Sequence, residues 1–282
     1  MKTSKLVKLS LLVLGIGLVI GIAPANRATI KSARNYSSRI VRSSNWKLWA
    51  EPYTQGSPTM GTTKSLAGKL MQLDKVATTK TGTYFQISRR GRTYGWVNAG
   101  ALTLPAVYKL PYTYTSQLYP VYAPNGCEAA SLKMALSVKG LASKTDLRSI
   151  IAKMPRAARP TAGFNGDPYT KSQPGEIRTI YPGPLTNYAK TYTKLAANLS
   201  GAGKQTLITE IKRGNPVIFA GTLHMQQRGS YHVLTLVGYQ PGRFLVADPY
   251  MKKSSPNKVF WVSTSKFMQL YRKQHSRAVV IR

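Results

Sequence analysis

The 282-residue sequence predicts an α+β protein in which a small all-β barrel precedes a larger module. Residues 46–104 contain several short β segments separated by glycine-rich turns, as in small barrels. Farther along, apolar spacing predicts a helix over residues 128–136, and residues 232–247 predict an antiparallel hairpin. At 43% hydrophobic and 10% aromatic residues the chain can bury a sizeable core, which excludes a disordered basic tail.

Residues 1–25 are typical of a secretory signal peptide. Three lysines precede an apolar run from Leu9 to Ala23, and the small residues at its end predict cleavage after Ala25. The run is shorter than the ~20 residues that a spanning helix needs, so a retained membrane anchor is the less favoured alternative. Cys127 is the only cysteine, which excludes a lipid anchor at the cleavage site.

Residues 26–45 are polar, basic and rich in serine, and they predict a flexible linker. In the barrel that follows, the segments 82–88 and 93–97 are strand-like and flank a turn in which Gly91 can take a positive φ. These features predict a β-hairpin. Residues 105–120 are rich in proline and tyrosine and predict an extended entry to the larger module, residues 105–282.

The run GTYFQISRRGRTYGWVNAGAL, with KLWAEP upstream, resembles the GW module of bacterial surface proteins, an SH3-like barrel. The resemblance spans residues 46–104 and implies non-covalent attachment to lipoteichoic acid and the cell wall. Trp96 is a candidate ligand contact, with a core aromatic residue as an equally good interpretation. Arg89, Arg90 and Arg92 cluster at the hairpin tip and could bind phosphates in bidentate fashion, or simply form a solvated turn.

Cys127 follows the turn sequence Pro-Asn-Gly and directly precedes the predicted helix. A lone cysteine in a secreted chain can be an inert buried thiol, form an intermolecular disulfide or act as a nucleophile. At a helix N-terminus the peptide dipoles stabilise a thiolate, and backbone N–H groups can bind an oxyanion, which favours the nucleophile. The adjacent Glu128 is interpreted as an acid stabilised by the helix dipole, without a catalytic role.

His232 is the best candidate for a catalytic base among the three histidines. It opens an apolar strand, and the strand after it ends at Asp248. If the turn centres near residue 241, facing positions sum to about 482, so Asp248 lies diagonally close to His232 and could hold its tautomer. Taken alone, Asp248 could also be a turn residue before proline. His224 and His275 have no acid nearby in the sequence and are interpreted as polar surface residues.

The order Cys, His, Asp, with the cysteine at a helix start and the other two on adjacent strands, resembles that of papain-like cysteine peptidases. The runs SQLYPVYAPNGCEAASLKMAL, GFNGDPY, GNPVIFAGT, YHVLTLVGY and FLVADPY resemble more closely the secreted relatives of bacteriocin-processing, double-glycine-leader peptidases. This resemblance implies an N-terminal helix packed on an antiparallel sheet and a triad of Cys127, His232 and Asp248. It also implies that Gln117 donates its neutral amide to the oxyanion.

The charge balance points to an anionic partner. The chain has 41 Lys and Arg against 8 Asp and Glu, a net charge of +33 that is spread over every segment. This favours adhesion to anionic wall polymers such as teichoic acid, lipoteichoic acid and peptidoglycan. One cysteine and three histidines leave no zinc cluster, so no metal or cofactor is expected, and the absence of RNP-like or zinc-finger patterns argues against nucleic acid.

The sequence therefore predicts a secreted, wall-associated cysteine peptidase of a Gram-positive surface. Its substrate would be an amide bond in a protein, a peptide or a wall peptide. The alternative from another class is a non-catalytic, cell-wall-binding or structural surface protein that keeps the peptidase fold.

Overall fold

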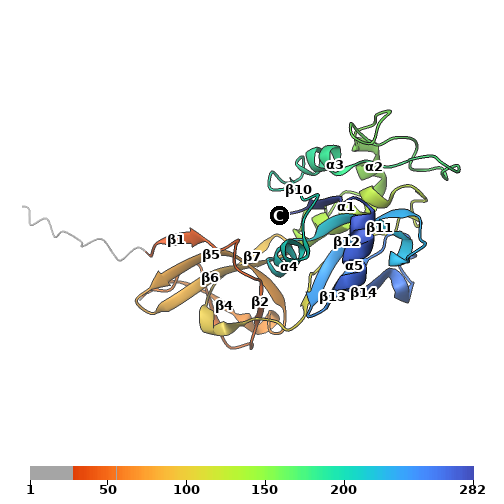
Figure 1. Ribbon diagram of the computed structural model, residues 1–282. Coiled ribbons are helices and arrows are strands. Elements are labelled where there is room, and N and C mark those ends of the chain that lie inside the picture. Colours follow the sequence, from red (N-terminus) through yellow and green to blue (C-terminus); the bar gives the residue numbers. More distant parts are fainter. Residues whose placement is uncertain (1–27, 55) are drawn as a thin grey trace, which may run out of the picture.

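The computed structural model describes residues 28–54 and 56–282, which form two modules joined side by side (Figure 1). The predicted leader, residues 1–25, lies outside the described residues. The smaller module is an antiparallel barrel-like sheet with the strand order β4-β3-β7-β6-β5-β2-β8, and β1 pairs with β5. Its strands are β1 (Ile30–Ser32), β2 (Arg39–Val41), β3 (Lys47–Trp49), β4 (Thr59–Thr62), β5 (Leu70–Thr79), β6 (Gly82–Arg89), β7 (Arg92–Asn98) and β8 (Leu102–Thr103).

The predicted hairpin of the barrel is confirmed. β6 and β7 are antiparallel and joined by a tight turn in which Arg90 and Gly91 have φ of 51° and 74°. Trp96 on β7 is only 3% exposed and packs in a cluster with Ala77 and Tyr84. Partly buried Trp49 and Tyr53 pack against this cluster, which lies on the opposite face of β7 from Val97 in the barrel core. The burial of Trp96 favours the interpretation as a structural aromatic residue, and a ligand contact of Trp96 stays a prediction.

The prediction of a flexible linker over residues 26–45 is wrong for its described part, residues 28–45. Residues 30–32 pair with β5 on one side of the barrel, and residues 39–41 pair with both β5 and β8. Strands of three residues are too short to show a period-two pattern, and their backbone hydrogen bonds are satisfied by strands that lie far away in the sequence.

The larger module is built on an antiparallel sheet with the order β10-β15-β11-β12-β13-β14, and β9 pairs with β12. The strands are β9 (Tyr108–Lys109), β10 (Ala197–Asn198), β11 (Val217–Thr222), β12 (Tyr231–Gln240), β13 (Arg243–Ala247), β14 (Val259–Ser263) and β15 (Ala278–Val280). The helices are α1 (Cys127–Val138), α2 (Leu147–Lys153), α3 (Pro182–Ala189), α4 (Lys204–Lys212) and α5 (Thr264–Lys273).

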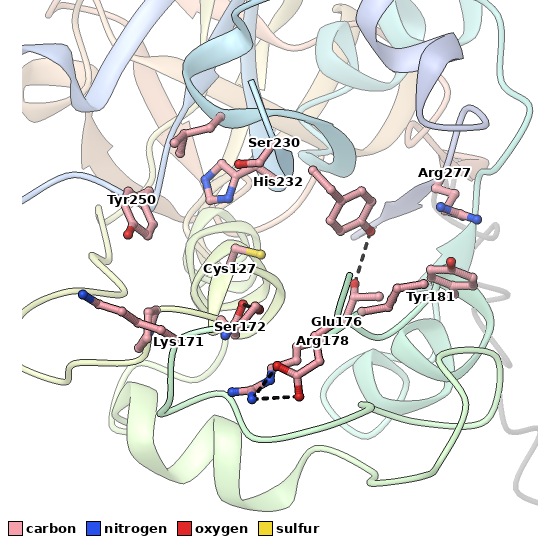
Figure 2. A pocket seen from close by; sticks show the side chains of 16 residues that line it. Cys127, Lys171, Ser172, Glu176, Arg178, Tyr181, Ser230, His232, Tyr250 and Arg277 are labelled. Atoms are coloured by element: carbon pink, nitrogen blue, oxygen red, sulfur yellow. Dashed lines mark hydrogen bonds and ion pairs between the residues drawn. The ribbon is translucent and has the colours of Figure 1, made fainter. Parts of the chain in front are cut away.

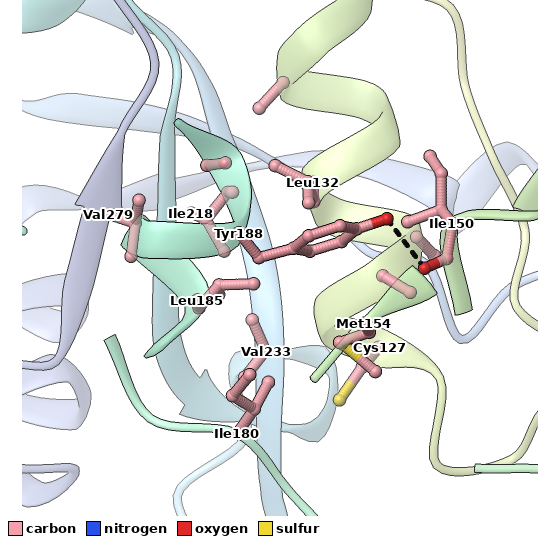
Figure 3. Close-up of a cluster of buried hydrophobic side chains, with 14 of the residues drawn as sticks. Cys127, Leu132, Ile150, Met154, Ile180, Leu185, Tyr188, Ile218, Val233 and Val279 are labelled. Atoms are coloured by element: carbon pink, nitrogen blue, oxygen red, sulfur yellow. Dashed lines mark hydrogen bonds between the residues drawn. The ribbon is translucent and has the colours of Figure 1, made fainter. Parts of the chain in front are cut away.

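Helices cover both faces of this sheet. Ile218 and Val233 belong to a buried cluster with side chains of α1, α2 and α3 (Figure 3). Val217, Phe219 and Leu234 belong to a second cluster with side chains of α4 and α5. Because both faces are buried, β11 and β12 are almost continuously apolar instead of alternating. The described part of the chain contains no helix whose length and apolar character would suit a membrane span.

The two modules meet through hydrogen bonds to backbone carbonyls. The Ser38 backbone N–H donates to the Lys212 carbonyl over 2.7 Å, and the Gln72 side-chain amide donates to the Gly214 carbonyl over 3.0 Å. The turn of the β6–β7 hairpin lies against the end of α1, where a Cβ on Gly91 would be 2.5 Å from the Lys139 carbonyl oxygen. Glycine is thus needed there for space as well as for its positive φ.

Lys139 lies in this junction, and its ammonium donates to Asn215 Oδ1 over 2.6 Å. Burial lowers the pKa of Lys139 to about 7, although the nearby Asp74 and Glu210 act in the opposite direction. An unfolded chain would restore a pKa near 10.5, so between about pH 7 and 10.5 the unfolded state binds more protons than the folded state. The free energy of unfolding should therefore rise with pH across this window.

Replacing Lys139 with methionine is expected to remove this part of the pH dependence. Denaturant unfolding of the wild type and of Lys139→Met at pH 7 and pH 9 would measure it. Lys144→Met, at an exposed position of the same module, should keep the wild-type slope. A Lys139→Met variant with an unchanged slope would contradict the assignment of this proton to Lys139.

Candidate active site

Cys127 is the first residue of α1, as predicted, and follows the turn that Gly126 closes onto the Ala123 carbonyl. No side chain caps the helix, because Gly126 occupies the N-cap position. The first backbone N–H groups of α1 therefore have no helical partner. The Cys127 side chain is only 7% exposed, but it reaches the wall of a cavity.

His232 and Asp248 meet at one end of the β12–β13 hairpin. Thr235 faces Ala247, the register that the sequence predicts, and a bulge shifts the pairing nearer to the turn. His232 Nε2 lies 2.7 Å from Asp248 Oδ1, so the predicted proximity of these two side chains is confirmed. The bond leaves Nδ1 as the imidazole nitrogen that can face a thiol.

His224 shares the same carboxylate, a contact that its interpretation as a polar surface residue did not anticipate. Its Nδ1 lies 2.7 Å from Asp248 Oδ2, and its backbone N–H donates to that oxygen over 3.2 Å. His224 belongs to a short turn, Leu223–Met225, and has a positive φ of 53°. The turn folds over the end of β13, and no acid near His224 in the sequence could have revealed this contact.

Asp248 is fully buried and accepts a further hydrogen bond from the Tyr250 N–H over 2.8 Å. Burial by itself raises the pKa of this carboxyl group. The hydrogen bond and charge of His232, with smaller contributions from Tyr250 and His224, outweigh burial and hold the pKa of Asp248 at about 2. The group is therefore a carboxylate that two histidines and a backbone N–H orient.

The thiol of Cys127 is directed toward an acid in the structure. Cys127 Sγ donates to Glu128 Oε2 over 3.3 Å, and no hydrogen bond among the described residues joins Sγ to His232. Burial, followed by the charge of Glu128, raises the pKa of Cys127 well above its usual value. In this resting arrangement, burial and the charge of Glu128 therefore act against the thiolate that the helix N-terminus was expected to favour.

Glu128 is itself fully buried. Its Oε1 accepts hydrogen bonds from the Thr179 hydroxyl and from the Ile180 N–H. Burial is the main reason that the pKa of Glu128 is raised. The sequence interpretation of an acid stabilised by the helix dipole missed this contact, since Thr179 and Ile180 come from a loop about fifty residues away.

Replacing Glu128 with glutamine is expected to lower the pKa of Cys127, because the change removes a negative charge beside the sulfur. The midpoint of the iodoacetamide alkylation rate against pH should move to lower pH, with several-fold faster alkylation near pH 7. Glu176→Gln is the matched control, since Glu176 lies at the exposed rim of the same cavity. An unchanged midpoint in Glu128→Gln would contradict this role.

Gln117 is fully buried but does not line the cavity. Its amide nitrogen donates to the carbonyls of Ala123 and Pro124, over 3.2 and 2.9 Å. The amide is thereby committed to the turn that leads into Cys127. In the described geometry the amide does not face the cavity, and the implied role of Gln117 as an oxyanion donor stays a prediction.

The cavity in front of Cys127 has a volume of about 530 Å³. Figure 2 shows Cys127 and His232 on facing walls, with Tyr250 beside the histidine. The Tyr250 ring contacts the His232 ring edge to face, with centroids 5.9 Å apart. The remaining lining residues are Pro124, Asn125, Lys171, Ser172, Glu176, Ile177, Arg178, Thr179, Tyr181, Leu223, Ser230, Tyr231 and Arg277. In residues 28–54 and 56–282, no three His, Cys, Asp or Glu side chains gather as metal ligands would.

None of the three arginines of the barrel hairpin lines this cavity, and two of them lie next to the larger module. Arg89 is half-buried at the junction, and Arg90 donates to the Thr113 hydroxyl over 2.6 Å. Arg92 is exposed and lies over the Tyr94 ring, 5.0 Å from its centroid. The three arginines predicted to bind phosphate therefore have different surroundings. Arg89 and Arg90 contact the larger module, and Arg92 faces solvent.

Comparison with known proteins agrees with both modules. The model of the Peptidase_C39 like family matches residues 109–279, and that of the GW (Gly-Tryp) dipeptide domain matches residues 31–103. A crystal structure of a candidate C39-like peptidase from Bacillus anthracis has a similar fold, with a TM-score of 0.51 at 23% identity, covering 61% of this chain and 94% of that one.

Two curated proteins are also similar. The uncharacterised protein YvpB of Bacillus subtilis is 26% identical over 180 residues, which are 56% of this chain and 69% of YvpB. Protein Ami of Listeria monocytogenes is 31% identical over 83 residues, which are 29% of this chain and 9% of Ami.

Proposed function

The chain belongs to the Peptidase_C39-like family, and on this premise we propose that it is a cysteine peptidase acting through Cys127, His232 and Asp248. The observation that carries the proposal is the 2.7 Å bond between His232 Nε2 and Asp248 Oδ1, on a wall of the cavity that Cys127 also lines. Cys127 starts α1, His232 lies on β12, and Asp248 directly follows β13. Hydrogen bonds between Ser131 of α1 and β12 support the proposal that these side chains act together.

In the proposed reaction His232 Nδ1 takes the proton from Cys127 Sγ as the sulfur attacks the carbonyl carbon of the substrate. Collapse of the tetrahedral intermediate breaks the C–N bond, and His232 returns the proton to the departing amine. Water then attacks the thioester carbonyl with His232 as base, the C–S bond breaks, and the carboxylic acid leaves while His232 returns the proton to Cys127 Sγ. Asp248 keeps the imidazole oriented and stabilises its protonated form.

The oxyanion would be bound by backbone N–H groups at the start of α1, beginning with that of Cys127. Gln117 could add its amide only by releasing the carbonyls of Ala123 and Pro124. Before the attack, the Cys127 thiol must also turn from Glu128 toward His232.

The proposal places this activity at a bacterial cell envelope. The GW domain is a cell-wall-binding type of domain, the leader over residues 1–25 would direct secretion, and the net charge of +33 favours anionic wall polymers. The wall polymers that would bind such a positively charged protein are teichoic acid, lipoteichoic acid and peptidoglycan. The substrate would be an amide bond of a peptide, a protein or a wall peptide.

One observation favours a second candidate, a non-catalytic surface protein with a peptidase fold. The Cys127 thiol is bonded to Glu128, and its pKa is raised, so the resting site holds a protonated sulfur. Such a protein would bind the wall without turnover.

Digestion of a mixed peptide library, read by mass spectrometry, separates the two functions. The peptidase should generate new termini at recurring sequences, and prior alkylation with iodoacetamide should suppress them. Treatment with a serine-directed fluorophosphonate serves as control and should leave the products unchanged. Equal products before and after complete alkylation of Cys127 would overturn the peptidase proposal.

A further inference from the structure

The lining of the cavity is positively charged. Lys171, Arg178 and Arg277 contribute side chains to it, and Glu176 is its one acidic residue. The Arg178 guanidinium pairs with the Glu176 carboxylate over 2.6 Å and also contacts the Thr170 hydroxyl. The charge of Arg178 is therefore compensated within the loop that carries it, and the two other cations define the electrostatics of the cavity.

Arg277 is held in a fixed position. Its guanidinium carbon lies 3.7 Å from the centroid of the Tyr181 ring, and its backbone carbonyl accepts from the Ala220 N–H over 3.0 Å. Figure 2 shows Arg277 above Tyr181 on one side of Cys127, with Lys171 on the other side. A guanidinium stacked on an aromatic face keeps its N–H groups available at its edge.

Within residues 28–54 and 56–282, no carboxylate lies within ion-pair distance of Arg277. The neighbouring wall is polar, because the Tyr231 hydroxyl lies 3.2 Å from the Thr179 hydroxyl oxygen and both residues line the cavity. Burial and the charge of Glu128 raise the pKa of Tyr231. The positive charge of Arg277 acts in the opposite direction, so it influences this wall of the cavity. Arg277 is thus a half-buried, oriented cation beside hydrogen-bonding groups.

We propose that Arg277 binds a carboxylate of the substrate, and that the enzyme therefore prefers acidic peptides. This inference rests on the proposed peptidase function. The carboxylate could belong to an acidic side chain near the scissile bond or to the C-terminus of the peptide. Both present two oxygens to the fork of the guanidinium, and such charge-assisted pairs are stronger than neutral hydrogen bonds.

The test uses the full-length protein and fluorogenic peptides built on a sequence that the wild type cleaves. Each peptide carries glutamate or glutamine at one position on either side of the scissile bond. A second pair ends in a C-terminal carboxylate or an amide. At the position that meets Arg277, we expect kcat/KM to be about tenfold higher for the carboxylate peptide, mainly through KM. Whichever pair shows the preference identifies the source of the carboxylate.

Variants assign the preference to Arg277. Arg277→Gln should reduce the carboxylate-to-neutral ratio to about one while still cleaving the neutral peptide, and Arg277→Lys should retain part of the ratio. Arg272→Gln removes the same charge from an exposed position of α5 and should keep the full preference. This control matters because the whole chain is basic.

The outcomes separate this inference from the function on which it rests. If the wild type cleaves no peptide, the proposed peptidase function fails. If it cleaves carboxylate and neutral peptides equally, or if Arg277→Gln keeps the preference, the peptidase function stands and the role of Arg277 is overturned.

Discussion

Replacement of Cys127 by alanine is expected to lower peptide hydrolysis on the order of 10⁶-fold, because no other thiol exists in the chain to form the acyl-enzyme. The fold should persist. Alanine has the highest helix propensity, and the side chain that it replaces lies at the first position of α1. The measurement is kcat/KM on a peptide identified from the library, with thermal unfolding of both proteins as the check on structure.

The same variant has a second expected effect. Removing the thiol deletes the hydrogen bond to Glu128, so the carboxylate keeps only its contacts with Thr179 and Ile180.

Product formation by Cys127→Ala at a rate close to that of the wild type would contradict the predicted loss of activity and would place the chemistry on other residues.

Replacement of Asp248 by asparagine is expected to lower kcat by about 10³- to 10⁴-fold with little change in KM. Asparagine keeps the shape of the side chain but has only one acceptor oxygen, whereas His232 and His224 each use one oxygen of the carboxylate. The amide also lacks the charge that would stabilise an imidazolium at His232. Steady-state kinetics across a pH series would measure the loss.

His224→Asn is the matched comparison for this variant. Asparagine tolerates the positive φ of His224, so the turn should form. His232 keeps its bond to Asp248 Oδ1, and we expect a smaller loss of kcat than in Asp248→Asn. A loss of equal size in both variants would mean that His232 is not the histidine through which Asp248 acts.

Asp248 also links stability to pH. Its pKa of about 2 lies below the ordinary value of 3.8, so the folded state holds the carboxylate more strongly than the unfolded chain does. This contribution to the free energy of unfolding is complete above the unfolded pKa and is lost as the pH falls toward 2. The unfolding free energy of Asp248→Asn should therefore decrease less between pH 5 and pH 2 than that of the wild type.

Local patterns were sufficient for the parts of the site that lie on regular elements. The Pro-Asn-Gly turn and the helical spacing after it placed Cys127 at the start of α1. Two apolar runs separated by a Pro-Gly turn predicted the register of the β12–β13 hairpin, and the register placed Asp248 beside His232. In both cases the residues that decide the geometry are neighbours in the sequence or across one hairpin.

Contacts between segments far apart in the chain could not be predicted from the sequence. His224 reaches Asp248 only because the turn after β11 folds over the end of β13, and Glu128 is buried only because a loop near residue 179 closes over it. The two main causes that raise the pKa of Cys127, its own burial and the adjacent Glu128 charge, arise from the same packing. The burial of the charged groups could not be derived from their positions in the chain.

The sequence by itself determined a two-module α+β protein, the turn and helix that present Cys127, and the hairpin that joins His232 to Asp248, since these depend on short-range backbone preferences and on residue periodicity. Tertiary structure decided which residues of 26–45 become strands, which arginines face the junction, and which charges surround the cavity. Those outcomes depend on desolvation and on pairing between segments far apart in the chain, and both arise only when the modules pack.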